Sequence, residues 1–172
     1  MSVAAALFAT LTLQQPDPLA PARTGQVLCY EPDVARQTCY GIASYRWLGD
    51  GTIVSDIVVA ASEVPAIFVH SSAPVSVRGD AECTRLVPSA DQITAIYEDG
   101  RRLGGSEFES FRRILGSSID QANGRGRELC FTYEPLANGD IKSTARIDGV
   151  ARPDLGGTAR WVRPADGWRV AF

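Results

Sequence analysis

The sequence contains one histidine and one lysine, and this scarcity limits the chemistry that it can support. His70 is the only side chain whose ordinary pKa lies near neutrality, so it is the single candidate for a histidine base. A serine hydrolase also needs a nucleophile beside that base. No Gly-x-Ser-x-Gly elbow occurs, and Ser71 would face away from His70 in a continuous strand. We therefore interpret His70 as a structural residue at a strand end and expect no catalytic residue.

Motifs for metals and phosphates are also absent. The cysteines are too far apart for the paired spacing of zinc ligands, and no Cys-x-x-Cys exists for dithiol redox work. Neither Gly-x-Gly-x-x-Gly nor a Walker pattern occurs. We expect no cofactor and no metal. Acidic side chains in predicted loops remain the candidates for an acid–base pair: Glu31, Asp33, Asp50, Glu63 and Glu134.

The sequence has no large excess of acidic over basic residues or of basic over acidic residues. The net charge of -3 creates no positive field that would attract nucleic acid or an anionic membrane. A chain of 172 residues with 45% hydrophobic residues suits one globular domain with a shared core.

Long hydrophobic runs are missing apart from Val3 to Leu13, which is too short to span a bilayer and has the length of a signal-peptide core. Ala20-Pro21-Ala22 would permit cleavage before Arg23, although no Lys or Arg precedes that residue. We predict a signal peptide over 1–22, a single domain over 23–172, and no membrane span after cleavage. The alternative is an Ala-rich leader of a cytosolic protein.

Four cysteines form an even set, which is typical of an oxidising compartment and supports export independently. Three pairings are possible. We favour Cys29–Cys39, which closes a short loop, and Cys83–Cys130, which joins the segments on either side of a helical block. The alternative is four reduced, buried cysteines.

The main predicted helix covers 106–123. Ser106 and Glu109 have the spacing of a capping box, and Asn123-Gly124 provides a stop. The apolar stripe recurs at three- and four-residue spacing: Phe108, Phe111, Leu115 and Ile119. A second capping box, Ser89 with Gln92, predicts a short helix that begins there and stops at Asp99-Gly100.

The remainder of the chain is predicted to be β. Period-two patterns and turn residues predict strands over 26–30, 38–47, 52–60, 66–70, 75–78, 82–87, 128–134, 141–148, 158–163 and 168–172. The last two are predicted to form a hairpin with Trp161 opposite Val170. The fold class predicted is α+β, an antiparallel sheet packed against the main helix and the short helix. Because Cys39 to Pro74 and Cys130 to Pro164 are similar intervals, we also consider two duplicated β units.

Aromatic side chains could form the core of a small sheet or line a ligand groove, and we favour the core: Tyr40, Tyr45, Trp47, Tyr133, Trp161 and Trp168. Trp47 is the last residue of a predicted strand and precedes Leu48-Gly49, so it is the aromatic residue most expected to be exposed at a hairpin tip. Trp47 is therefore our candidate binding residue.

No motif identifies an activity. We predict an exported protein of the periplasm or extracellular space that acts as a non-enzymatic binding or interaction module of the cell envelope, with a protein or a small ligand as its partner. One alternative is a small secreted hydrolase that uses the loop carboxylates or the region of Ser71, Ser72 and His70. Another is an inhibitor of a periplasmic enzyme, with the Cys29–Cys39 loop as its contact surface.

Export predicts a defined intact mass. Expressed with its leader in a Gram-negative host and recovered from the periplasm, the protein should begin near Arg23 and resist alkylation under denaturing, non-reducing conditions. A cytosolic product of full length that accepts four alkyl groups would contradict both export and the disulfides.

Overall fold

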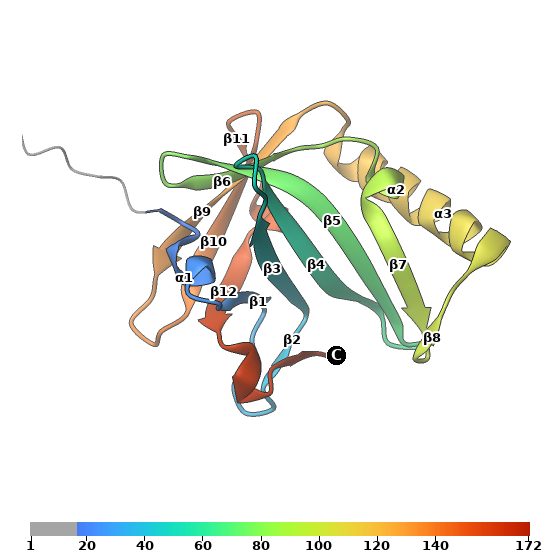
Figure 1. The fold of residues 1–172 in the computed structure, drawn as a ribbon, viewed down its shortest axis with the longest axis horizontal. Helices are drawn as coiled ribbons and strands as arrows, with labels where there is room; N and C mark the ends of the chain where they lie inside the picture. The colour runs from blue at the N-terminus through green and yellow to red at the C-terminus, as the bar shows by residue number, and fades with distance from the viewer. Residues whose placement is uncertain (1–16) are drawn as a thin grey trace, which may run out of the picture.

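The computed structural model describes residues 17–172, most of which form a closed antiparallel β-barrel of eight strands (Figure 1). The barrel strands are β1 (Val27–Tyr30), β3 (Gly41–Trp47), β4 (Ile53–Ser62), β5 (Ile67–Arg78), β6 (Ala81–Arg85), β9 (Glu128–Pro135), β10 (Ile141–Ile147) and β12 (Gly157–Val162). Each pairs with the next in this order, and β12 pairs with β1 to close the cylinder. The barrel is therefore an up-and-down meander with one long insertion between β6 and β9.

That insertion builds a wing on the barrel wall. It contains α2 (Ser89–Gln92), β7 (Ile93–Glu98), β8 (Arg101–Arg102) and α3 (Gly105–Asn123). The first half of β5 pairs with β7, whereas its last three residues pair with β6. Strand β5 thus belongs to the barrel and to the wing at once. The wing face that continues the barrel interior carries Ile67 and Val69, and it is covered by α3 through Phe108, Phe111 and Leu115.

Short elements complete the two ends of the barrel. Helix α1 (Ala20–Arg23) precedes β1, and β11 (Val150–Ala151) pairs antiparallel with the end of β10. Strand β13 (Arg169–Val170) pairs in parallel with β2 (Thr38–Cys39) near the C-terminus. Two single 3₁₀ turns, η1 (Pro153–Leu155) and η2 (Pro164–Asp166), flank β12.

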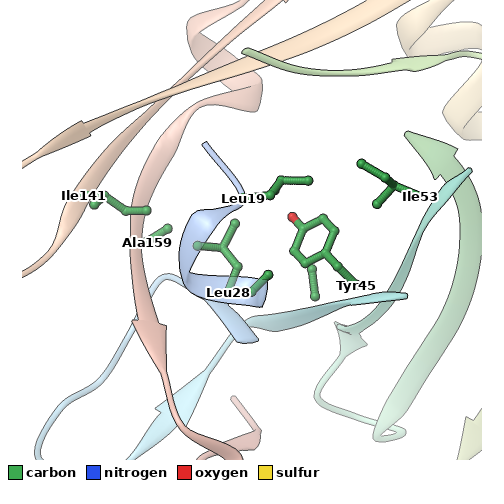
Figure 2. Packing of buried hydrophobic residues seen from close by; sticks show 8 residues of the cluster. Leu19, Leu28, Tyr45, Ile53, Ile141 and Ala159 are labelled. Atoms are coloured by element: carbon green, nitrogen blue, oxygen red, sulfur yellow. The ribbon is translucent and has the colours of Figure 1, made fainter. Parts of the chain in front are cut away.

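The barrel interior is filled by side chains that alternate along the strands. In β10, for example, Ile141, Ser143, Ala145 and Ile147 are all buried, and the residues between them are exposed or half-buried. Figure 2 shows Leu19 reaching from the N-terminal segment into the middle of the core cluster, toward Tyr45. Leu19 is fully buried, and Ala22 of α1 is also buried. Two residues of the predicted signal peptide thus lie in the core, and the cleavage position remains a prediction.

Two disulfides join the four cysteines in the pairings that the spacing favoured. Cys29–Cys39 ties β1 to β2, and its sulfur atoms pack with Val162 and Trp168. Cys83–Cys130 joins directly opposed residues of β6 and β9, the two strands that flank the insertion. Bonded cysteine pairs are typical of proteins exported to an oxidising environment.

The predicted α+β fold class is wrong. Helix α3 does not support a sheet between two β units; it lies outside the barrel beside β7 (Figure 1). Among its 19 residues only Gly116 is buried, where α2 approaches too closely for a side chain. The two segments considered as duplicated units do not form separate sheets either, because β9 pairs with β6 and β12 pairs with β1. The main-helix prediction was correct in position, but helices play a minor part in the architecture.

Four local predictions also differ from the structure. The segments 66–70 and 75–78, predicted as two strands, are parts of one continuous strand, β5. The segment predicted as a short helix is helical only over Ser89–Gln92 and then becomes β7, whose Ile93 and Ile96 are buried. Helix α3 has Gly104 at its N-cap with no side-chain hydrogen bond, so the Ser106 capping box does not form. The predicted C-terminal hairpin is absent, since Trp161 lies opposite Leu28.

The burial of Leu19 predicts a large effect on stability. In a chain that retains this residue, Leu19→Ala should lower the free energy of unfolding by about 2 to 5 kcal/mol, because it leaves a cavity in a closed core. Chemical denaturation measures the change. Val64→Ala is the matched control, because Val64 is 86% exposed and the substitution should cost less than about 0.5 kcal/mol. Equal effects of the two substitutions would contradict the placement of Leu19.

Candidate functional site

A buried carboxylate lies in the barrel interior among phenols. Glu82 of β6 is 6% exposed, and its Oε2 atom accepts hydrogen bonds from the hydroxyls of Tyr45 on β3 (2.9 Å) and Tyr133 on β9 (2.7 Å). Tyr30 of β1 completes this set, which we call the lumen cluster: Glu82, Tyr30, Tyr45 and Tyr133. Four strands separated in sequence therefore bring one acid and three phenols together.

Burial dominates the electrostatics of the lumen cluster. It raises the pKa of Glu82, and the hydrogen bonds from Tyr133 and Tyr45 offset this only in part. Burial also raises the pKa values of the three phenols, and the negative charge of Glu82 adds to each of these shifts. No cation among the described residues contributes to the pKa of Glu82. The carboxyl group is thus held by neutral donors alone.

Two further polar atoms in the same region lack hydrogen-bond partners. Ser143 is 5% exposed, lies opposite Tyr133 in the β9–β10 pair, and has a buried Oγ with no partner. The buried indole nitrogen of Trp47 is likewise without an acceptor. Buried polar atoms are almost always paired, so each of these two atoms is available to form a hydrogen bond with a ligand.

A second feature is an apolar groove of 430 Å³ on the outer face of the wall. We call it the outer groove, and its lining residues come from β3, β4, β5, β7, β13 and the turn after β7: Ile42, Val58, Phe68, His70, Tyr97, Gly100 and Val170. The alternation of the strands turns these side chains away from the interior. These residues lie outside the barrel interior, and only Ile42 among them packs against a buried cluster, that of Cys29, Cys39 and Val162.

His70 lies in the outer groove rather than in a catalytic arrangement. Its ring stacks at 5.0 Å on Tyr97, and its register partner Val58 also faces outward. Ser71 pairs with Ile57 and therefore projects to the opposite face. Burial, and then the positive charge of Arg102, lower the pKa of His70. The described residues thus bring no serine nucleophile to this imidazole.

Trp47 occupies the end of β3 and is half-buried. It packs against the core cluster, and the guanidinium of Arg23 lies 4.7 Å above its ring. The side chain is therefore part of the barrel rim. A role of Trp47 in binding remains a prediction.

No family model, curated protein or solved structure matches this chain. The functional argument consequently depends on its own residues. Within residues 17–172, no helix is long and apolar enough to cross a membrane.

Three of the five candidate loop carboxylates are engaged in separate contacts, and the other two, Glu63 and Glu134, are exposed. Glu31 accepts a hydrogen bond from the backbone of Thr158, Asp33 pairs with Arg36, and Asp50 accepts from the backbone of Thr52. Such contacts are typical of turn and cap residues rather than of a catalytic pair.

One group of possible metal ligands occurs in the described part of the chain: Cys83, Glu128 and Cys130. Its two sulfur atoms are joined in a disulfide, and a disulfide offers no thiolate to a metal. These residues therefore do not form a plausible metal centre.

Sequence reasoning did not find Glu82. The strand Ala81–Arg85 lacks clear alternation of polar and apolar residues, so no local pattern reveals that Glu82 points inward. The outer groove had a detectable signal. Phe68 and His70 are two positions apart in a predicted strand, which places them on one face, and Val58 is on the neighbouring strand.

The raised pKa of Glu82 predicts a specific pH dependence of stability. Between the ordinary carboxyl pKa of 4.5 and the raised value, the native state binds the proton that the unfolded state has released. The stabilising contribution of Glu82 to the free energy of unfolding is thus fully present below the ordinary pKa. It is lost as the pH rises through the raised pKa of the native state. Wild-type stability, measured by urea denaturation at several pH values, should fall relative to Glu82→Gln as the pH rises from 4 to 8.

The control for this series is Glu134→Gln, which changes an exposed carboxylate of the same sheet. Its stability difference from the wild type should not follow the pH in this way. A constant difference between wild type and Glu82→Gln would contradict the burial of an ionisable carboxyl in the lumen.

Proposed function

We propose that this protein is an exported interaction module that binds a partner protein through the outer groove and catalyses no reaction. The partner inserts apolar side chains between Phe68, Tyr97 and Val170 and presents a carboxylate to Arg102. The observation that carries this proposal is the groove itself, an apolar hollow on the outside of the barrel, although Ile42 also packs against the Cys29–Cys39 cluster and the Phe172 ring lies 5.7 Å from that of Phe68.

The shallow form of the groove favours a protein over a small molecule. Small-molecule sites bury most of the ligand surface, which requires a concave pocket. The outer groove is open along the sheet, and residues of five strands contribute to it. A protein partner covers such a surface and excludes water from both apolar faces.

The charge at the groove edge favours an acidic partner. Arg102 lies opposite Tyr97 in the β7–β8 pair and is exposed. None of the ion pairs among the described residues involves Arg102, whereas its neighbour Arg101 pairs with Glu98 and Glu107. A free guanidinium beside an apolar surface matches a carboxylate that flanks apolar side chains.

The disulfides support a location in the periplasm or outside the cell, where such bonds persist. The Cys29–Cys39 loop adjoins this surface, because the backbone N–H of Arg169 donates to Gln37 just before Val170 enters the groove. An enzyme as the partner would make the protein an inhibitor, so that version of the function shares the same surface. No geometry among the described residues favours a hydrolase.

Site-specific photo-cross-linking tests the proposal in the cells that natively produce the protein. Tyr97→benzoylphenylalanine should form one discrete protein adduct, which mass spectrometry identifies. The matched control is Ile114→benzoylphenylalanine on α3, because Ile114 is 64% exposed and lies on the helix that covers the other face of the wing. Adding Arg102→Glu should reduce the Tyr97 adduct about tenfold or more, since like charges would then face each other.

The groove is rejected as the binding surface if position 97 gives no adduct or gives the same adducts as position 114. Charge complementarity is rejected if Arg102→Glu leaves the adduct unchanged, or if Arg113→Glu, a charge reversal on α3, reduces it as much as Arg102→Glu does.

A further inference from the structure

The lumen cluster has a property that the outer groove does not explain. Glu82 is buried in the barrel interior, and no arginine or lysine among the described residues neutralises it. An isolated carboxylate in an apolar interior is costly, so such groups normally have a cationic partner. The structure thus contains a buried carboxyl group that a cationic ligand could pair with.

The surroundings of Glu82 suit a cation. Three phenol rings belong to the lumen cluster, and Trp161 lies 6.0 Å from Tyr45 between ring centroids. Aromatic faces attract ammonium groups, especially where water is excluded. The unpartnered Oγ of Ser143, which is 5% exposed, offers an additional acceptor for an ammonium hydrogen.

The N-terminal segment fills the space beside this cluster. Leu19 is fully buried and packs among residues of at least four strands, including Leu28, Tyr45 and Ile53, as Figure 2 shows. The tip of the Tyr45 ring, which carries the hydroxyl that binds Glu82, points toward Leu19 in the same view. A ligand that took the place of Leu19 would therefore lie next to the hydrogen-bonded carboxylate.

The segment is held at the barrel end without strand pairing. Its backbone hydrogen bonds, from Ala20 to Gln26, are made within residues 17–26. An exposed ion pair of 2.8 Å joins Arg23 to Asp17, and the Arg23 guanidinium rests on Trp47. Exposed ion pairs contribute little to stability, so the Leu19 side chain is the main anchor of the segment. Such an attachment permits exchange with a ligand.

We propose that the barrel lumen is a binding site for a primary organic ammonium ion with a small branched or aromatic body, and that, in a chain that retains them, residues 17–23 occupy this site in the absence of the ligand. The ammonium pairs with Glu82 and lies against the rings of Tyr30 and Tyr45. The apolar body takes the position of Leu19. This site is separate from the outer groove, and neither proposal depends on the other. Eight-stranded up-and-down barrels have interiors of a size that either fills with side chains or holds one small ligand.

A purely structural role for Glu82 makes a different prediction. A cavity that replaces Leu19 would then bind apolar molecules of the right size whether or not they carry a charge, as engineered apolar cavities do. The discriminating quantity is the preference for an ammonium over a neutral group on the same carbon skeleton.

Isothermal titration calorimetry on the full chain measures this preference. The probes are 3-methylbutylammonium, whose body copies the leucine side chain, and the neutral 3-methylbutan-1-ol. Leu19→Ala should bind the ammonium at least about tenfold more tightly than the alcohol, since only the ammonium completes the ion pair. Leu19→Ala/Glu82→Gln should lose this preference and keep the affinity for the alcohol. Leu19→Ala/Glu134→Gln, the matched control, should retain it.

A second variant keeps the test valid if Leu19→Ala does not fold. Asp17→Asn removes the surface ion pair and leaves every lumen side chain in place. Because the exposed ion pair contributes little, its loss should raise the ammonium affinity over the wild type by a factor of up to about five, and Glu82→Gln should abolish this gain. Equal binding of ammonium and alcohol, or binding that Glu82→Gln does not weaken, would overturn the proposal. Absence of ammonium binding in the folded variants would also overturn it.

Discussion

The pairing of β12 with β1 is the contact on which the rest of the structure depends. It joins Val27–Tyr30 to Ala159–Val162, segments at opposite ends of the described chain, and converts a curved sheet into a cylinder without free edges. Only a closed cylinder has an interior. The burial of Leu19, the isolation of Glu82 from cations and the convergence of three phenols all follow from closure. The outward direction of the groove residues follows from it as well.

Much of the local structure could be predicted from the sequence, because its signals are local. Alternation and turn residues located nearly all barrel strands, and the capping and stripe patterns located α3 within a residue of its observed bounds. The preferred cysteine pairings are those in the structure: Cys29–Cys39 closes a short loop, and Cys83–Cys130 joins the strands on either side of the helical insertion. Apart from the second disulfide, these successes concern elements whose neighbours are close in sequence.

The fold class could not be predicted in the same way. Closure depends on which strand meets which, and no residue of β1 or β12 specifies its partner by pattern alone. The strong helix signal over 106–123 suggested a central element, yet an amphipathic stripe shows only that one face is covered. The segment around Ile93–Ile96 is apolar on both sides and occupies the wing interior, so its periodicity suited a helix as well as a strand.

The candidate site was only partly accessible to sequence reasoning. The outer groove contains two residues with clear spacing, Phe68 and His70, but the contribution of Val170 depends on a parallel contact with β2 that has no local signal. Glu82 is linked to Tyr45 across 37 positions and to Tyr133 across 51. Such a cluster is a property of the closed barrel rather than of any segment.

The position of the Cys83–Cys130 bond has a consequence for how the molecule opens. It crosslinks β6 and β9 at the point where the insertion leaves and rejoins the barrel, so the eight-stranded circuit is covalently continuous without the wing. The wing can then exchange its amide hydrogens through local opening while the barrel stays protected. The insertion is also replaceable by a tight turn in principle, because the barrel ladder on either side of it is already fixed. The disulfide therefore fixes the barrel pairing of β6 with β9 independently of the wing, which remains attached through its pairing with β5.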